Sequence, residues 1–452
     1  MERVLPRILL AAPKSGAGKT TVVCGLLQAL VNRKMNPAAC KCGPDYIDPL
    51  FHSELIGARG CNLDLFFTEE PEARRLLSQS AEGCDVAVLE GVMGYYDGLG
   101  GVTDRASAYH VARATDTPVV LILDARGASL SLCAQLRGFL GFRRPSAIAG
   151  VILNRCSAMQ YEMLSKIIAE ECGVPVFGCL PTLPDCALES RHLGLVTAAE
   201  VGNLKEKLQI LAENLEKTVD VDGLLELARS APPLAVPDRA PEAVAGRRPV
   251  LAVAKDRAFC FYYRENLRLL EELGAEIVEF SPLTDAALPP CDGLYLGGGY
   301  PELYTKQLSE NASMLESIAK AIRSGLPTFA ECGGFLYLHE EMTGEDGVSR
   351  PMVGIIPGGC RNTGKLRRFG YVTLTAKKDN LLCGAGDSIR AHEFHYFDSD
   401  SNGGDFTAEK PVTGRSWDCV HATDSLFAGF PHLYFPANPE FARRFVRRMR
   451  GV

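Results

Sequence analysis

The stretch ILLAAPKSGAGKTT, residues 8–21, joins an apolar run to a glycine-rich loop that ends in Gly-Lys-Thr. A buried strand followed by such a loop and a helix binds phosphate, because backbone N–H groups and the positive helix end face the anion. Lys19 adds a fixed positive charge, and the hydroxyl of Thr20 can bind Mg²⁺. Pro13 replaces the first glycine of GxxxxGK[ST], which leaves the variant with an early lysine at Lys14. We therefore predict a nucleotide site formed by Lys14, Gly16, Gly18, Lys19, Thr20 and Thr21.

Two acidic segments belong with this loop. An apolar run ends in Glu90, within EGVMGYYDG at residues 90–98, and KCGPDYIDP at residues 41–49 follows a second expected strand. Carboxylates beside nucleotide phosphates normally hold a metal ion or orient a nucleophile, since unpaired negative charge would repel the nucleotide. We predict that Thr20 and Glu90 hold the metal. The remaining acids are candidates for substrate binding or activation: Asp45, Asp48 and Asp97. Asp45 and Asp48 could instead form turns beside the prolines of residues 41–49.

Short apolar runs recur along both halves of the chain, and each is followed by glycine or polar residues and then a helical period. They lie at residues 8–12, 86–89, 119–123 and 151–153, and again at 250–254, 277–280, 294–296 and 328–330. This pattern is typical of buried parallel strands. We predict an α/β protein with two open, mainly parallel sheets and with its sites at the carboxyl ends of the strands.

One segment separates the two series. Residues 230–249 contain five prolines, which remove backbone donors and disfavour regular structure. A chain of 452 residues also exceeds what one hydrophobic core usually supports. We predict one domain at residues 1–230, a linker at 231–248 and a second domain at 249–452.

The second domain carries a candidate nucleophile. FAECGGF, residues 329–335, places Cys332 on a tight turn between an expected strand and a helix, where the helix dipole favours a thiolate. An oxyanion hole needs a further donor, which LGGGYPE at residues 296–302 can supply. His432 is the best candidate base, although a single histidine is more often a structural residue. The predicted oxyanion donors come from Gly298, Gly299 and Gly333.

Histidines and cysteines elsewhere do not form a zinc pattern. His392 and His395 would face opposite sides of a strand, so shared ligation is not expected, and substrate contact or strand-edge polarity remain open. The sixteen cysteines include no CxxC pair, and the closest two are Cys40 and Cys42. Apart from Cys332, we expect most of them to be small buried hydrophobes.

Composition narrows the class of protein. Apolar residues make up 46% and charged residues 23%, as in ordinary globular proteins, and no run reaches the roughly 18 apolar residues of a membrane span. The net charge of −7 argues against a general nucleic-acid binder. The N-terminal residues show no secretory signal, so we expect a cytoplasmic protein without nucleic-acid or membrane partners.

Taken together, these segments resemble the cobyrinate a,c-diamide synthase family, and the likeness covers nearly the whole chain. The phosphate loop by itself is shared with dethiobiotin synthetases and MinD-like ATPases, whereas the combination is specific. The resemblance implies a P-loop, dethiobiotin-synthetase-like ATPase joined to a class I glutamine amidotransferase domain. The segments that carry it are residues 12–20, 43–49, 90–98, 297–302, 331–334 and 392–396.

The resemblance implies a ligase of cobalamin biosynthesis that uses ATP, Mg²⁺ and L-glutamine to amidate the a and c acetate carboxylates of cobyrinate through acyl phosphates. Cys332 would attack the glutamine amide while His432 manages the proton. Tyr46 and Ile47 would contact the corrinoid. Amidotransferases of this class usually carry His-x-Glu, but here Tyr434 stands two residues after the histidine, a departure that the corrinoid branch shares.

Other functions remain open at this stage. The substrate could be another carboxylated tetrapyrrole, such as hydrogenobyrinate or nickel sirohydrochlorin. A function of a different class is a MinD-like ATPase switch, in which the amidotransferase domain would be a non-catalytic interaction module. The sequence does not indicate an oligomeric state.

Overall fold

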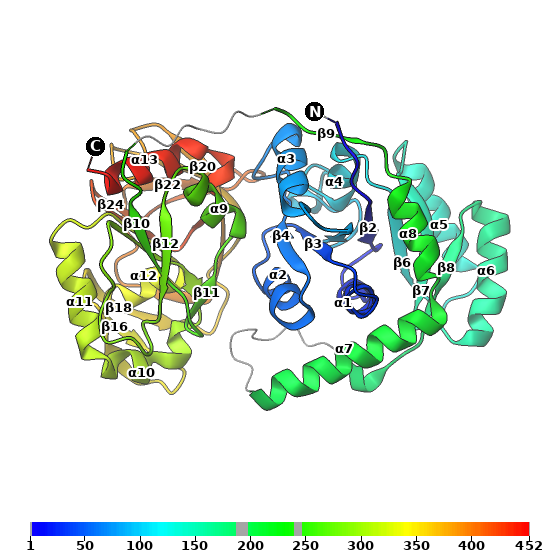
Figure 1. The fold of residues 1–452 in the computed structure, drawn as a ribbon, viewed down its shortest axis with the longest axis horizontal. Coiled ribbons are helices and arrows are strands. Elements are labelled where there is room, and N and C mark those ends of the chain that lie inside the picture. The colour runs from blue at the N-terminus through cyan, green and yellow to red at the C-terminus, as the bar shows by residue number, and fades with distance from the viewer. Residues whose placement is uncertain (1, 187–197, 239–245, 452) are drawn as a thin grey trace. The chain divides into compact units, whose positions relative to one another are not determined.

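The computed structural model describes residues 2–186, 198–238 and 246–451, and the chain divides into two units, Met1–Arg239 and Ala240–Val452 (Figure 1). Part of the expected linker, residues 239–245, lies outside the described residues. Another part is a strand rather than irregular chain, since β9 (Leu234–Ala235) pairs with β1 (Glu2–Arg3) in the first unit. The prolines of this segment flank β9 and do not occupy it, so they remove no donor from the pairing.

The first unit is built on a seven-stranded sheet in the order β4-β3-β5-β2-β6-β7-β8, in which all neighbouring strands are parallel. The strands predicted in this half are confirmed. The sheet strands are β2 (Arg7–Ala11), β3 (Pro37–Cys42), β4 (Arg59–Asn62), β5 (Val86–Gly91), β6 (Val119–Asp124), β7 (Ile148–Asn154) and β8 (Val176–Leu180). The helices are α1 (Lys19–Asn32), α2 (Ile47–Phe51), α3 (Glu70–Ser80), α4 (Ala108–Ala114), α5 (Ser131–Phe142), α6 (Ala158–Cys172), α7 (Ala198–Thr218) and α8 (Val221–Arg229).

Apolar side chains cover both faces of this sheet. Ile8 and Leu10 of β2 join one core cluster with residues of α1, α7 and α8, while the alternate residues Leu9 and Ala11 are buried as well. A strand buried on both faces reads as a continuous apolar run, which is why the sequence pattern identified it. Among the described residues, we find no helix with both the length and the apolar character that crossing a bilayer requires.

One pair of cysteines departs from the expectation of buried thiols. Cys40 of β3 and Cys61 of β4 lie directly opposite each other in neighbouring strands and form a disulfide, with their Cα atoms 4.6 Å apart. The two residues are 21 positions apart in sequence, and only the register of the two strands brings them together.

The second unit contains a six-stranded sheet in the order β12-β10-β13-β15-β25-β24, parallel except for the last pairing. The strands predicted in this half all belong to it. Its strands are β10 (Val250–Ala254), β12 (Glu276–Phe280), β13 (Gly293–Leu296), β15 (Thr328–Glu331), β24 (His421–Ala422) and β25 (Leu426–Gly429). The helices of the unit are α9 (Arg264–Glu272), α10 (Thr305–Glu310), α11 (Ala312–Arg323), α12 (Gly333–Tyr337) and α13 (Pro439–Met449).

Three further sheets, which the strand pattern did not reveal and in which all neighbouring strands except β16 and β18 are antiparallel, complete this unit. A five-stranded sheet in the order β23-β22-β19-β20-β26 packs through Val372 and Ala391 against the same core as Leu251 and Val253 of β10. Its strands are β19 (Arg368–Ala376), β20 (Ser388–His395), β22 (Phe406–Glu409), β23 (Ser416–Cys419) and β26 (His432–Leu433). The smaller sheets contain β11 (Phe259–Phe261) with β14 (Gly298–Gly299), and β16 (His339–Thr343), β17 (Ser349–Pro351), β18 (Ile356–Asn362) and β21 (Phe397–Ser399).

Candidate active sites

The phosphate loop lies between β2 and α1, and the end of β7 supports it. Gly16 and Gly18 have φ angles of 76° and 92°, in the left-handed region that favours glycine. A Cβ atom at Gly18 would lie 2.0 Å from Nδ2 of Asn154, an amide that donates a 2.8 Å hydrogen bond to the carbonyl of Ala17. No side chain caps the start of α1, so its first N–H groups can serve an anion.

Lys19 reaches back across this loop. Its side chain is buried, and Nζ donates to the carbonyl oxygens of Met93, at 2.5 Å, and of Lys14, at 3.3 Å. Burial lowers the pKa of Lys19 to about 8, although Glu90 acts in the opposite direction. Both carbonyls belong to the expected phosphate-site loops, so the ammonium group lies where those loops meet. The side chain of Lys14 is exposed.

Glu90 is the centre of a buried charge cluster. Its Oε1 atom accepts hydrogen bonds from Thr20 Oγ1 and from Lys41 Nζ, each at 2.7 Å. Lys41 also pairs with Asp48, and its side chain is only 6% exposed. Burial by itself would lower the pKa of Lys41, but Glu90 and Asp48 raise it above its usual range. The cluster thus joins the phosphate loop, β3 and β5 through one lysine that the sequence reading did not single out.

A second residue of this cluster, a histidine, was also not predicted from the sequence. His52, in the short helical turn His52–Ile56 after α2, places Nε2 3.9 Å from Oε2 of Glu90 and 3.7 Å from Sγ of Cys24. Burial lowers the pKa of His52, which favours a neutral imidazole. No motif marks this histidine, and only the folding of residues 43–56 over the end of β3 brings it to Glu90.

The other predicted acids accept hydrogen bonds from different backbone groups. Asp45 Oδ1 accepts the backbone N–H groups of Ile47, at 2.9 Å, and Asp48, at 3.2 Å, which is the turn-forming geometry left open by the sequence. Burial, followed by the charge of Asp48, raises the pKa of Asp45 to about 6. Asp97 Oδ2 accepts from the backbone N–H of Gly94 at 3.0 Å. Tyr46 and Ile47 are half-buried at the start of α2.

The cluster fits a small, hard cation. Thr20 and Glu90 bring a hydroxyl and a carboxylate oxygen within 2.7 Å of each other, and Mg²⁺ favours such oxygen ligands. Oε2 of Glu90 is buried and accepts no hydrogen bond from the described residues. Within residues 2–186, 198–238 and 246–451 there is also no group of three or more His, Cys, Asp and Glu side chains that could hold a metal unaided. Mg²⁺ bound through one or two protein oxygens plus phosphate and water agrees with this arrangement.

The cysteine elbow has the strained geometry of a nucleophile. Cys332 joins β15 to α12 with φ 49° and ψ −105°, and its backbone N–H donates to Gly429 at 2.8 Å. A Cβ atom at Gly334 would lie 2.1 Å from the carbonyl oxygen of Leu296, so only glycine permits this close approach. A non-glycine residue at positive φ is uncommon and is found where the surrounding structure holds it for function.

The glycine segment predicted to supply oxyanion donors lies against this elbow. A Cβ atom at Gly333 would be 3.0 Å from the backbone nitrogen of Gly299, and one at Gly298 would be 2.6 Å from Cε1 of His432. The structure therefore brings together Gly298, Gly299, Gly333 and the candidate base from three separate segments.

His432 occupies β26, beside the elbow. It is buried, hydrogen-bonds to Cys332, and has Nδ1 3.6 Å from Oε1 of Glu331. Burial by itself would lower the pKa of His432, but its interactions with Cys332 and then with Glu331 more than offset this effect and raise the pKa to about 10. The arrangement therefore favours an imidazolium beside Cys332, and a neighbouring positive charge supports a cysteine nucleophile.

The two histidines of residues 392–396, His392 and His395, have different surroundings. His392 lies opposite His432 in the β20–β26 pairing, and burial lowers its pKa to about 3. His395 stacks on Phe430 with ring centroids 3.8 Å apart and bonds to the carbonyl of Phe397 at 2.7 Å. Strand-edge polarity does not apply to His392, because this part of β20 lies between β19 and β26.

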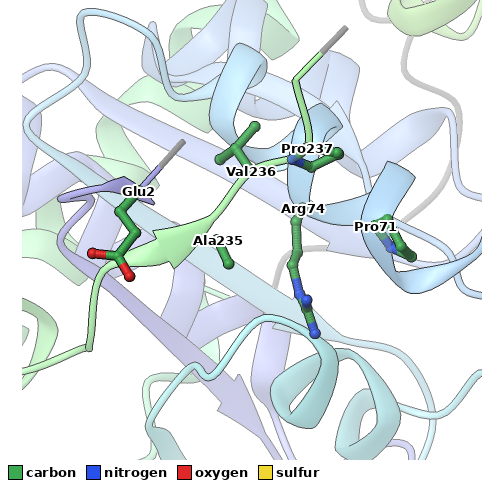
Figure 2. A pocket seen from close by; sticks show the side chains of 6 residues that line it. All are labelled: Glu2, Pro71, Arg74, Ala235, Val236 and Pro237. Atoms are coloured by element: carbon green, nitrogen blue, oxygen red, sulfur yellow. The ribbon is translucent and has the colours of Figure 1, made fainter.

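A surface pocket of the first unit is separate from these residues (Figure 2). It lies beside the β1–β9 pairing and contains none of the predicted site residues. Its lining residues are Glu2, Pro71, Arg74, Ala235, Val236 and Pro237.

Comparisons with known proteins match both units. Residues 8–196 match the CobQ/CobB/MinD/ParA nucleotide binding domain family, and residues 250–440 match the CobB/CobQ-like glutamine amidotransferase domain family. The cobyrinate a,c-diamide synthase of Caldanaerobacter subterraneus is 38% identical over 97% of each chain. The enzyme of the same name from Salmonella typhimurium is 39% identical over 98% of each chain. The one from Listeria innocua is 40% identical over 96% of this chain and 97% of its own.

Proposed function

Because the chain belongs to the cobyrinate a,c-diamide synthase family, we propose that it amidates the a and c acetate carboxylates of cobyrinate, using ATP and glutamine. The observation that supports this most directly is the presence, in one chain, of a phosphate-loop site around Lys19 and a cysteine–histidine site around Cys332. A carboxylate does not react with ammonia, since its leaving group would be oxide. The first site would convert it to an acyl phosphate, and the second would release ammonia.

In the first unit, the phosphate loop would bind the nucleotide phosphates through backbone N–H groups and Lys19. Thr20 and Glu90 would hold Mg²⁺, which neutralises developing phosphate charge. Lys41 would keep Glu90 and Asp48 in place and balance their charge. Without this lysine, two carboxylates close to the phosphates would repel the nucleotide.

The residues of the 43–49 loop would bind the tetrapyrrole beside the phosphates. Asp45 and Asn62 hold the loop, since Asn62 donates to the carbonyls of Gly43, at 2.8 Å, and Asp45, at 2.6 Å. We assign Tyr46 and Ile47 to substrate contact, and Asp97 to fixing the loop that supplies the Met93 carbonyl to Lys19.

In the second unit, Cys332 would attack the side-chain amide of glutamine while the backbone N–H groups near Gly299 and Gly333 stabilise the oxyanion. His432 would hold the thiol proton and pass it to the departing ammonia. Water would then hydrolyse the thioester to glutamate. We assign the synthetase domain to residues 1–230 and the amidotransferase domain to residues 249–452, and we place the enzyme in the cytoplasm, where ATP and glutamine are supplied.

Product analysis tests the substrate. Purified protein is incubated with cobyrinate, ATP, Mg²⁺ and glutamine, and chromatography with mass spectrometry counts the amides, each of which removes one negative charge. We expect a diamide. Hydrogenobyrinate and nickel sirohydrochlorin serve as competing substrates, and efficient amidation of either one without a cobyrinate diamide would assign the enzyme to that substrate instead.

Replacing the nucleophile tests the division between the two sites. The Cys332→Ala variant should lose glutamine-supported amidation and keep amidation with a high concentration of ammonia, because Cys332 serves only nitrogen release. Equal loss with both nitrogen donors in a folded variant would contradict two separate sites. A wild-type protein that hydrolyses ATP but neither hydrolyses glutamine nor forms any amide would favour a switch over an enzyme of this class.

A further inference from the structure

We propose that Glu331, the residue before the nucleophile, is the positioning residue for His432, in place of the acid that a His-x-Glu pair would supply. The inference rests on the proposed glutamine chemistry of this site. Glu331 ends β15, its side chain is fully buried, and its Oε1 lies 3.6 Å from Nδ1 of His432. The acid therefore comes from the nucleophile's own strand and not from the histidine's segment.

Two donors fix the carboxylate of Glu331. The hydroxyl of Tyr295 in β13 donates to Oε1 at 2.8 Å, and the backbone N–H of Leu433 donates to Oε2 at 3.1 Å. Both carboxylate oxygens are thus hydrogen-bonded, which offsets the cost of burying the charge. Leu433 follows His432 directly, so the same carboxylate also anchors the backbone that carries the imidazole.

The position that the usual acid would occupy holds no carboxylate. Tyr434 is buried there and packs edge-on against Tyr263, with ring centroids 5.0 Å apart. The titratable groups around His432 are contributed by several elements: Glu331 from β15, Cys332 from the elbow, and His392, Glu393 and His395 from β20. Burial lowers the pKa of His392 to about 3 and that of His395 to about 4, so neither supplies a charge at neutral pH. Burial raises the pKa of Glu393 to about 7 and disfavours its ionised form, whereas Oε1 of Glu331 lies 3.6 Å from Nδ1.

In this position Glu331 would act on the reaction through His432 and would not itself contact glutamine. The proton of Cys332 moves to His432, and the resulting imidazolium carries its charge beside the fixed carboxylate. The thiolate then forms a bond to the amide carbon, the carbon–nitrogen bond breaks, and the imidazolium proton goes to the leaving ammonia. Glu331 keeps its charge throughout, and it holds the ring with Nδ1 toward itself so that Nε2 remains for the thiol and the leaving group.

The experiment compares Glu331→Gln and Glu331→Asp with Glu276→Gln, an exposed glutamate of the same unit. Glutamate release is measured against pH and glutamine concentration, and ammonia-supported amidation is measured in parallel. For Glu331→Gln we expect kcat for glutamine to fall by about 10²–10⁴-fold, the usual range for losing acid–base assistance or the correct histidine tautomer. KM and ammonia-supported amidation should stay within about threefold, Glu331→Asp should restore part of kcat, and Glu276→Gln should behave as wild type.

The reactivity of Cys332 gives a readout that a purely structural role would not move in this direction. Without the carboxylate, the imidazolium is less stable, so the pH at which iodoacetamide alkylates Cys332 half-maximally should rise. Tyr295→Phe removes one hydrogen-bond donor to Glu331 and keeps the acid, so the pH of half-maximal alkylation should rise by a smaller amount. This variant provides the test if Glu331→Gln does not fold. The proposal is overturned if kcat for glutamine stays within threefold in Glu331→Gln, if the alkylation profile is unchanged in both variants, or if glutamine and ammonia activities fall together. Failure of wild-type ammonia-supported amidation would instead reject the proposed function, while glutamate release would still test Glu331.

Discussion

Lys41→Met should destabilise the first unit strongly, because it removes the one cation that, among the described residues, pairs with both Glu90 and Asp48. Methionine keeps the aliphatic length of lysine, so the change isolates the charge. Glu90 is 1% exposed and cannot recover water, whereas Asp48 is 14% exposed and can do so in part. Removing one partner of a buried ion pair typically costs about 3–5 kcal/mol.

The free energy of protonating a carboxylate sets an independent ceiling on this cost. The variant can neutralise Glu90 by binding a proton, and for an ordinary glutamate that costs about 3.7 kcal/mol at pH 7 and about 1 kcal/mol at pH 5. The penalty therefore grows as pH rises from 5 to 7, because the proton must be taken from an increasingly dilute supply. We expect a loss of about 3–4 kcal/mol at pH 7 that shrinks to about 1 kcal/mol at pH 5.

Urea unfolding at both pH values, in EDTA and without nucleotide, measures this loss. Circular dichroism reports both units, while the single tryptophan, Trp417, reports the second unit and should show an unchanged transition. Arg33→Met is the matched control, since Arg33 also pairs with two carboxylates of the first unit, Glu216 and Asp222, but is 30% exposed. Its loss should be about 0–1 kcal/mol. A Lys41→Met penalty no larger than that of Arg33→Met, or one that does not depend on pH, would refute the buried counter-charge.

Further predictions concern the two reactions. Lys19→Ala should abolish ATP-dependent amide formation and keep at least part of the glutaminase activity, as measured by product mass spectrometry and glutamate release; near-normal amidation would reject Lys19 as a phosphate ligand. Glu90→Gln should raise the Mg²⁺ concentration for half-maximal transfer of ¹⁸O from labelled substrate carboxylate to phosphate, and an unchanged Mg²⁺ curve would make Glu90 a purely structural residue. Gly298→Ala should lower glutaminase activity at least about tenfold and spare ammonia-supported amidation, since its Cβ would lie 2.6 Å from the His432 ring; equal rates would place the imidazole elsewhere. Because the pKa of His432 is raised to about 10, glutaminase activity should persist above pH 8 and fall only as pH rises through about 10. An alkaline loss near pH 7 would contradict the raised pKa of His432.

Local sequence determined the parts of this protein whose chemistry and conformation depend on neighbouring residues. The run at residues 8–12 is apolar at every position because its strand is buried on both faces, and the glycines at 16 and 18 permit the left-handed turn that follows. The Cys332 elbow is equally local, since a strand, a nucleophile and two glycines are consecutive in the chain. The nucleotide loop and the nucleophile could therefore be predicted from sequence.

Tertiary structure decided which distant side chains complete each site. Lys41, His52 and Glu90 come from separate segments and meet only because β3 and β5 are neighbours in the sheet. Cys40 and Cys61 form a disulfide only through the register of β3 with β4. The antiparallel sheet that carries His432 leaves a weak local signal, because its strands are partly exposed and β26, which holds the histidine, has only two residues.

The acid beside His432 shows the same limit most clearly. In a His-x-Glu pair the acid lies two residues after the histidine, but here that residue is Tyr434. The carboxylate that faces the imidazole is Glu331, about a hundred residues earlier. Local sequence specifies backbone conformation and the chemistry of single residues. The pairing of charges across a core depends on strand order and register, which the whole chain determines together.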